Sequence, residues 1–205
     1  MRFLSYEGSF MQGTLVLARL TGLNLLWMLC CIPIVTAGPS TAAMYYAANQ
    51  MRQGDNHFFR NFKEGWKKHW KQAMPVGILF EILIAVFYFG YTAISENNIP
   101  NSKVILFIAL LCAITLVMTM LWEFPIMINF SGSFLDLIFN AFLFAFMYAP
   151  YTIVQAVLVG LWGYAVTHFY IIAVIVSLFA GALIAYVSLL MDEAAFRKYR
   201  QPSQK

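Results

Sequence analysis

Charged residues are scarce in this sequence. They make up 11% of its 205 residues, whereas hydrophobic residues make up 61% and the mean hydropathy is +0.72. Typical soluble domains are about 25% charged and about 45–50% apolar. The composition therefore excludes an ordinary soluble domain and indicates a membrane protein. The length fits one compact membrane domain covering residues 1–205.

Cysteines are few, and the common catalytic motifs are absent. Cys30, Cys31 and Cys112 lie in apolar runs without CxxC or zinc-ligand spacing, so the sequence predicts neither a disulfide framework nor a metal site. It contains no Walker A, GxSxG, HExxH or GxGxxG motif. We therefore expect no catalytic residue, no metal and no cofactor, and we expect that the protein is not an enzyme.

What the sequence does contain is a series of long apolar runs. A helix needs about 20 mainly apolar residues to cross a hydrocarbon core of about 30 Å. Five runs are long enough, and spans are expected at about 14–34, 73–95, 103–128, 137–160 and 166–190. A sixth run, 39–52, is shorter and less apolar than these five. The prediction is an all-α, polytopic transmembrane bundle with five firm spans, a short sixth helix and a tail at 191–205.

The distribution of basic residues predicts the orientation of the chain. Most Lys and Arg residues lie within 52–72 or in the tail 191–205. Basic residues near the ends of spans collect on the cytoplasmic side of a membrane. We therefore expect a multi-pass protein of the cell membrane whose loop 52–72 and C-terminus are cytoplasmic.

Three ionisable residues, Arg19, Glu81 and Glu123, lie inside predicted spans. If 39–52 crosses the membrane, the N-terminus is cytoplasmic and all three groups share the inner leaflet, where they can pair. If 39–52 does not cross, Arg19 lies in the other leaflet, and an unpaired charge at depth costs about 2.5–3.5 kcal/mol. We therefore favour the crossing hairpin and a structural ion-pair cluster. A transport or gating pathway is the alternative role for these residues.

The break between the first two apolar runs follows from its residues. Pro33 ends the first helix because proline lacks an N–H group and clashes with the preceding turn. Pro39 suits the first turn of the return helix, where the missing N–H group is not needed. The small residues at 40–43 allow close packing of helices. A turn with helix capping is favoured over an anion site at 36–41.

The stretch 57–72, HFFRNFKEGWKKHWKQ, combines aromatic and basic residues at helical spacing. Aromatic side chains form one expected face and basic side chains fill much of the rest. This pattern predicts an interfacial amphipathic helix resting on anionic lipid. A docking surface for a cytoplasmic partner is the alternative, and placement between spans argues against nucleic acid. The basic residues are Arg60, Lys63, Lys67, Lys68 and Lys71.

A family resemblance rests on NLLWMLCCIPIVTAGPSTAAMYYAANQMRQGD and the following FFRNFKEGWKKHWKQA. These stretches resemble the N-terminal signature of the YesL-like bacterial integral membrane proteins. The resemblance covers about the first third of the chain, and the remainder agrees only in length and in the number of apolar runs. The main matching positions are Asn24, Trp27, Pro33, Thr36, Gly38 and Thr41.

The YesL-like resemblance implies an integral membrane protein of unknown biochemical function. Members of that family are often encoded beside carbohydrate ABC-transporter components, glycoside-degrading enzymes and two-component regulators. We therefore expect an accessory or regulatory bacterial membrane protein associated with carbohydrate uptake or its signalling, with ABC-transporter subunits or a sensor kinase as candidate partners. The alternative is a small homo-oligomeric permease that uses Glu81 or Glu123. The sequence leaves the oligomeric state open.

Overall fold

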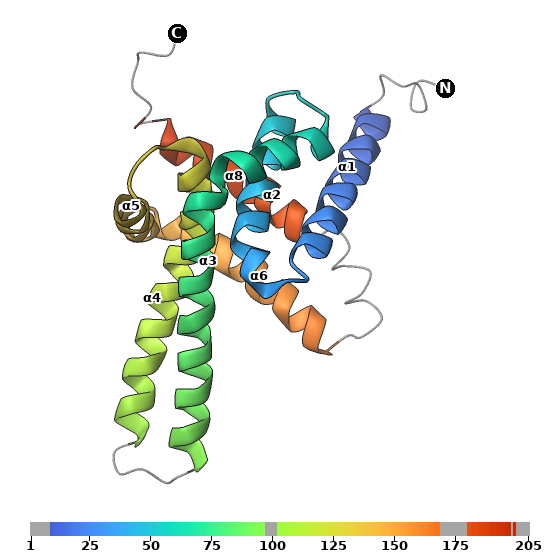
Figure 1. Ribbon diagram of the computed structural model, residues 1–205. Helices are drawn as coiled ribbons and strands as arrows, with labels where there is room; N and C mark the ends of the chain where they lie inside the picture. The colour runs from blue at the N-terminus through green and yellow to red at the C-terminus, as the bar shows by residue number, and fades with distance from the viewer. Residues whose placement is uncertain (1–8, 97–101, 169–179, 198, 200–205) are drawn as a thin grey trace.

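The computed structural model describes residues 9–96, 102–168, 180–197 and 199, and every regular element within them is a helix (Figure 1). The all-α prediction is confirmed. In chain order the elements are α1 (Ser9–Cys30), η2 (Ile34–Thr36), α2 (Ala37–Arg52), α3 (Phe58–Glu96), α4 (Ser102–Asn129), α5 (Phe134–Met147), α6 (Ala149–His168) and α8 (Ala180–Phe196).

Three of the described helical segments are long and apolar enough to cross a membrane. They are Gln12–Cys30, Phe58–Ser95 and Lys103–Asn129, and the bent pair α5 and α6 makes a fourth if it counts as one span. These segments support a membrane protein. Of the predicted span 166–190, residues 169–179 lie outside the described part of the chain.

Helix α2 corresponds to the predicted short helix 39–52 and lies at the centre of the bundle. It contacts α1, α3, α4 and α8, and most of its 16 residues are buried. Ala42, Ala43, Ala47 and Ala48 have no exposed surface. Since lipid is as apolar as leucine, helices in a membrane associate through close packing, which small residues permit. The small residues of α2 therefore place this short helix inside the bundle.

The predicted interfacial helix 57–72 and the predicted span 73–95 form one continuous helix. Helix α3 runs for 39 residues with Pro75 inside it. Figure 1 shows its first part running across the bundle before the helix turns and descends beside α4. Pro75 explains this bend, because proline removes one backbone hydrogen bond and crowds the preceding turn. The chain changes direction between 57–72 and 73–95, as expected for an interfacial helix followed by a span. No break separates the two segments, however.

The predicted span 137–160 is not one continuous helix. Helices α5 and α6 meet at a bend of 98°, with Tyr148 between them and Pro150 in the first turn of α6. A proline at this position cannot continue the hydrogen-bond ladder of the preceding helix. Helix α6 then continues to His168, through the gap between the predicted spans 137–160 and 166–190, and α8 extends past residue 190 into the predicted tail.

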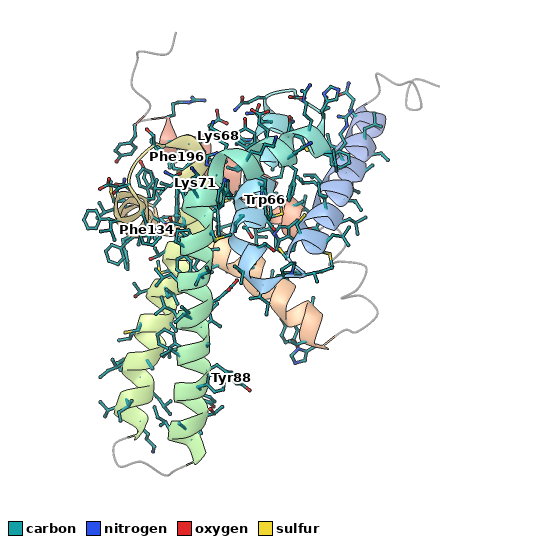
Figure 2. All side chains as sticks on the ribbon, viewed as in Figure 1. Trp66, Lys68, Lys71, Tyr88, Phe134 and Phe196 are labelled. Carbon is teal, nitrogen blue, oxygen red and sulfur yellow. The ribbon has the colours of Figure 1, made fainter. Side chains whose placement is uncertain are left out.

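The lower parts of α3 and α4 form a hairpin that extends beyond the rest of the described bundle (Figure 1). Its outward side chains are apolar, and Figure 2 shows Tyr88 pointing away from both helices. A cavity of about 760 Å³ lies between α3, α4 and α5. A second cavity of about 480 Å³ lies between the distal halves of α3 and α4. The hairpin therefore presents a long apolar surface that contains two grooves.

Candidate functional site

The three ionisable residues predicted to cluster lie on three different helices. Glu123 of α4 is completely buried, and neither carboxylate oxygen has a hydrogen-bond partner in the described part of the chain. Among the described residues no ion pair joins Arg19, Glu81 and Glu123. The expected ion-pair cluster is therefore not formed. Glu81 instead lines a cavity of about 130 Å³ together with Thr41 and Gly77.

A polar cluster, formed by the buried Gln155 and Asp192 with Arg52 and the half-exposed Glu193, joins α2, α6 and α8. The Gln155 Nε2 atom donates a hydrogen bond to Asp192 Oδ1 at 2.7 Å, and neither side chain is exposed. The Arg52 Nη1 atom donates to the carbonyl oxygen of Leu189 at 2.7 Å, and Nη2 pairs with Glu193. One guanidinium group thus ties the end of α2 to two positions on α8.

The same cluster contains polar atoms that have no partner within the described residues. These atoms are Asp192 Oδ2, Gln155 Oε1 and Arg52 Nε. A buried polar group without a hydrogen bond is costly, so the nearby positive charge of Arg52 and the amide of Gln155 are needed to hold the Asp192 carboxyl group inside the protein. The cluster therefore holds α2, α6 and α8 together by polar contacts.

Sequence reasoning missed most of this cluster. The sequence places Asp192 in the predicted tail 191–205 and Arg52 in the predicted loop 52–72, and nothing in the pattern around Gln155 joins it to either of them. The available signal was the continuation of small and apolar residues after Asp192 and Glu193, at Ala194, Ala195 and Phe196. That pattern extends the helix and carries Asp192 into the core.

A second set of buried polar contacts holds α4 against the α5–α6 bend. The Trp122 Nε1 atom donates to Thr152 Oγ1 at 2.8 Å, and the Thr152 hydroxyl donates to the Ala145 carbonyl oxygen at 2.8 Å. The ring of Phe196 packs edge-on to Trp122 with centroids 6.0 Å apart. Thr152 and Gln155 are close to one turn apart on α6, so α6 presents one polar edge to both α4 and α8.

Two of the residues that resemble the YesL-like signature link α1 to other helices. The Asn24 Oδ1 atom accepts a hydrogen bond from the backbone N–H of Ala182 at 2.9 Å, which joins α1 to α8. The Trp27 Nε1 atom donates to Thr41 Oγ1 at 3.1 Å, which joins α1 to α2. These bonds give Asn24, Trp27 and Thr41 structural roles.

The remaining signature residues shape the turn that leads into α2. Pro33 precedes η2 in an extended conformation, and the Thr36 hydroxyl lies 2.6 Å from the carbonyl oxygens of Cys30 and of Pro33. Gly38 lies against Gly77, where a side chain would collide with the backbone of α3. The signature residues therefore form a turn and a helix-packing contact, but neither η2 nor α2 begins with a side-chain cap, so the capping part of the expectation is not met.

We define the basic segment as residues 57–72 at the start of α3. Its basic side chains Arg60, Lys63, Lys67, Lys68 and Lys71 are exposed, as predicted. The predicted aromatic face is divided, because Phe62 is buried in the core whereas Phe59 and Trp70 are exposed. A buried stripe that includes Asn61, Gly65 and His69 faces the bundle instead.

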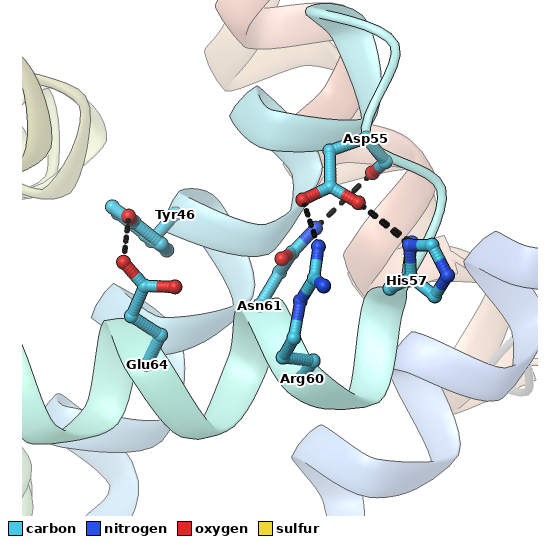
Figure 3. Close-up of polar contacts among 6 residues, drawn as sticks. All are labelled: Tyr46, Asp55, His57, Arg60, Asn61 and Glu64. Carbon is cyan, nitrogen blue, oxygen red and sulfur yellow. Dashed lines mark hydrogen bonds and ion pairs between the residues drawn. The ribbon is translucent and has the colours of Figure 1, made fainter.

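Asp55 organises the turn between α2 and α3 (Figure 3). Its Oδ1 atom lies 2.9 Å from His57 Nδ1, its Oδ2 accepts from Arg60 Nη2 at 2.6 Å, and its carbonyl oxygen accepts from Asn61 Nδ2 at 3.1 Å. The hydrogen bonds from the side chain and backbone of His57, followed by that from Arg60, hold the pKa of Asp55 below its ordinary value. This turn fixes the start of the basic segment.

Helix α2 also supports the middle of the basic segment. The Tyr46 hydroxyl donates to Glu64 Oε1 at 2.9 Å (Figure 3), and Lys68 Nζ lies 5.3 Å from the centroid of the Tyr46 ring. Gly65 lies so close to Tyr46 that an added Cβ would be 2.8 Å from its side chain. The basic segment is therefore a surface held in place by the core helix.

Comparison with known proteins gives one family match. Residues 20–91 match a family described as "Protein of unknown function, DUF624". The match covers the second half of α1, all of α2 and most of α3, which include the signature residues and the basic segment. No curated protein and no solved structure matches the chain. Over these residues the chain is similar to a family whose biochemical function is unknown.

Proposed function

We propose that this chain is an accessory or regulatory protein of the bacterial inner membrane that acts by binding another membrane protein. The observation that carries the proposal is the α3–α4 hairpin. Within the described residues it extends away from the bundle as a pair of apolar helices, and cavities of about 760 and 480 Å³ open along it. A surface of this size and chemistry suits a transmembrane helix of a partner.

Small residues support this role of the hairpin. Gly90, Ala109 and Ala113 line the distal cavity between α3 and α4. Small residues let a neighbouring helix approach closely, and close packing is what drives helix association in lipid. An added Cβ at Gly90 would meet no atom within 4 Å in the described structure, so the space beside it is open to a partner.

The proposed setting is carbohydrate uptake or its signalling. It is suggested by the YesL-like resemblance, and the candidate partners are the membrane subunits of a carbohydrate ABC transporter or a membrane-bound sensor kinase. The proposed topology places the basic segment and both termini in the cytoplasm, because basic residues collect on that side. The protein itself is proposed to be non-catalytic.

Photocrosslinking in the native host tests the proposal. A photoreactive amino acid at Phe87 or Leu111, which line the cavities of the hairpin, should capture one membrane protein that mass spectrometry identifies as a transporter subunit or a sensor kinase. Leu161 of α6 is the matched control, because it is apolar and exposed but outside the hairpin. Equal capture of that protein from Leu161, or capture of lipid alone at all three sites, would contradict the proposal.

A permease is the second candidate, and Glu123 is the observation that favours it. A buried carboxyl group without a partner in the described residues, on an apolar helix, is a default candidate for a proton or substrate pathway. A permease of this kind requires uptake by reconstituted vesicles that is abolished in Glu123→Gln and retained in Glu81→Gln. Sugar uptake by the purified wild-type chain without any partner would make this candidate the better one.

A further inference from the structure

A groove runs between α1 and the basic segment of α3. Its volume is about 350 Å³, and Leu26 and Cys30 of α1 form one part of its lining. Figure 2 shows Trp66 in the space between α3 and α1, below Lys68. The wall that α3 contributes consists of Phe59, Phe62, Lys63, Trp66 and Lys67. The groove therefore combines an apolar interior with two amino groups that come from one helix.

The two lysines of the groove differ from the other basic residues nearby. Lys63 and Lys67 are four residues apart, so they lie on the same face of α3, and both are exposed. No acidic side chain in the described part of the chain pairs with either of them. In contrast, Arg60 is paired with Asp55. Lys68 and Lys71 lie over the rings of Tyr46 and Trp70. Two positive charges are thus left at the rim of an apolar groove.

We propose that this groove binds one anionic phospholipid, with its phosphate between Lys63 and Lys67 and one acyl chain along Leu26 and Cys30. Basic residues on an amphipathic helix attract anionic headgroups, and buried acyl carbons add an apolar contribution. Trp66 provides the amphipathic ring that is typical of the headgroup level of a bilayer. A soluble anion would contact the lysines but leave the apolar wall uncovered, which is why the occupant is a lipid.

The proposed groove site is more specific than the sequence-based expectation of a general contact with anionic lipid. A general electrostatic contact would use every lysine of the basic segment equally. A groove site would depend on Lys63 and Lys67 and on the space beside Cys30. Lys68 and Lys71 lie farther along α3, toward its bend (Figure 2), and they line no part of this groove. The chain therefore offers a matched pair of controls.

Native mass spectrometry of the purified full-length protein, titrated with phosphatidylglycerol or phosphatidylcholine, measures this binding directly. The wild type should bind one phosphatidylglycerol more tightly than phosphatidylcholine. Lys63→Gln with Lys67→Gln should weaken phosphatidylglycerol binding by about 30-fold, which corresponds to about 2 kcal/mol. Lys68→Gln with Lys71→Gln removes the same charge and should leave the affinity within about twofold of the wild type.

The apolar part of the groove is tested by filling it. Cys30→Phe should weaken binding of the lipid while both lysines remain, and Leu26→Phe serves as the second variant if Cys30→Phe does not fold. Equal affinity for the two lipids would overturn the proposal. Equal losses in the two lysine pairs, or unchanged affinity in a folded groove-filling variant, would overturn it as well. The result does not depend on the hairpin partner, so the two proposals fail independently.

Discussion

Gly38 of α2 and Gly77 of α3 are in direct backbone contact. A Cβ atom added to Gly77 would lie 2.7 Å from the Cα atom of Gly38, and one added to Gly38 would lie 2.3 Å from the carbonyl oxygen of Ala73. Both distances are far below van der Waals contact, and the opposing atoms belong to the backbone. The start of α2 can therefore approach α3 only because both positions lack a side chain.

Substitution at this crossing should destabilise the protein. Gly77→Ala forces the two helices apart, and overpacking of this kind typically costs about 1–3 kcal/mol. Gly160→Ala on α6 is the control, since an added Cβ there meets no atom within 4 Å in the described structure. Thermal unfolding in detergent should show a lower Tm for Gly77→Ala and an unchanged or higher Tm for Gly160→Ala. A Gly77→Ala protein as stable as the wild type would refute the close crossing.

The hydrogen bond between Gln155 and Asp192 should contribute measurably to stability. Gln155→Leu leaves the Asp192 carboxyl group buried without its amide donor, and stranding a buried polar group costs about 1–3 kcal/mol or more for a charge. Asn140→Leu removes an amide from an exposed position and is expected to change stability little. Denaturant titrations in detergent would compare the two variants. Similar losses of stability in the two variants would show that the buried hydrogen bond contributes no more than an exposed amide.

Arg52 should contribute more to the stability of the protein than Arg60, which is exposed. Arg52→Gln breaks the bonds to the Leu189 carbonyl oxygen and to Glu193, and hydrogen bonds that involve a charge contribute about 1.5–3 kcal/mol. The Arg60 side chain is 63% exposed in its pair with Asp55, so Arg60→Gln should cost about 0.2–1 kcal/mol. Limited proteolysis would report on the end of α8, which Arg52→Gln should expose first.

The turn at Asp55 should make stability depend on pH. The folded pKa of Asp55 is lowered by His57 and Arg60, so its contribution is complete above the unfolded pKa of about 3.9 and declines as the pH falls below that value. Asp55→Asn removes the titration. The difference in Tm between the wild type and Asp55→Asn should therefore be constant from pH 7 to about 5 and shrink below about pH 4. A difference in Tm that grows on acidification would contradict the prediction that the ionised Asp55 carboxylate stabilises the fold.

The features predicted correctly from the sequence are those that depend on local chemistry. Pro33 and Pro39 marked the turn into α2, and the small residues after Pro39 marked its close packing. The exposed lysines of the basic segment followed from their charge alone. Each of these inferences needs only the neighbouring residues, because proline geometry and solvation act locally.

The features that were missed depend on the orientation of whole helices. Arg19, Glu81 and Glu123 were grouped by depth in the membrane, but depth does not determine which way each helix is rotated. The two prolines Pro75 and Pro150 also could not be interpreted from the sequence alone. Helix α3 continues through Pro75, whereas the chain bends by 98° just before Pro150. Whether a proline bends or ends a helix depends on the surrounding helices that satisfy the released carbonyl group.

The position of Arg52 also has a consequence for how the protein is made. The groups that it binds follow it in the chain by 137 and 141 residues. With only 16 residues, α2 is too short to be a stable membrane segment by itself. The contacts that hold the end of α2 to α8 can therefore form only after the ribosome has synthesised α8.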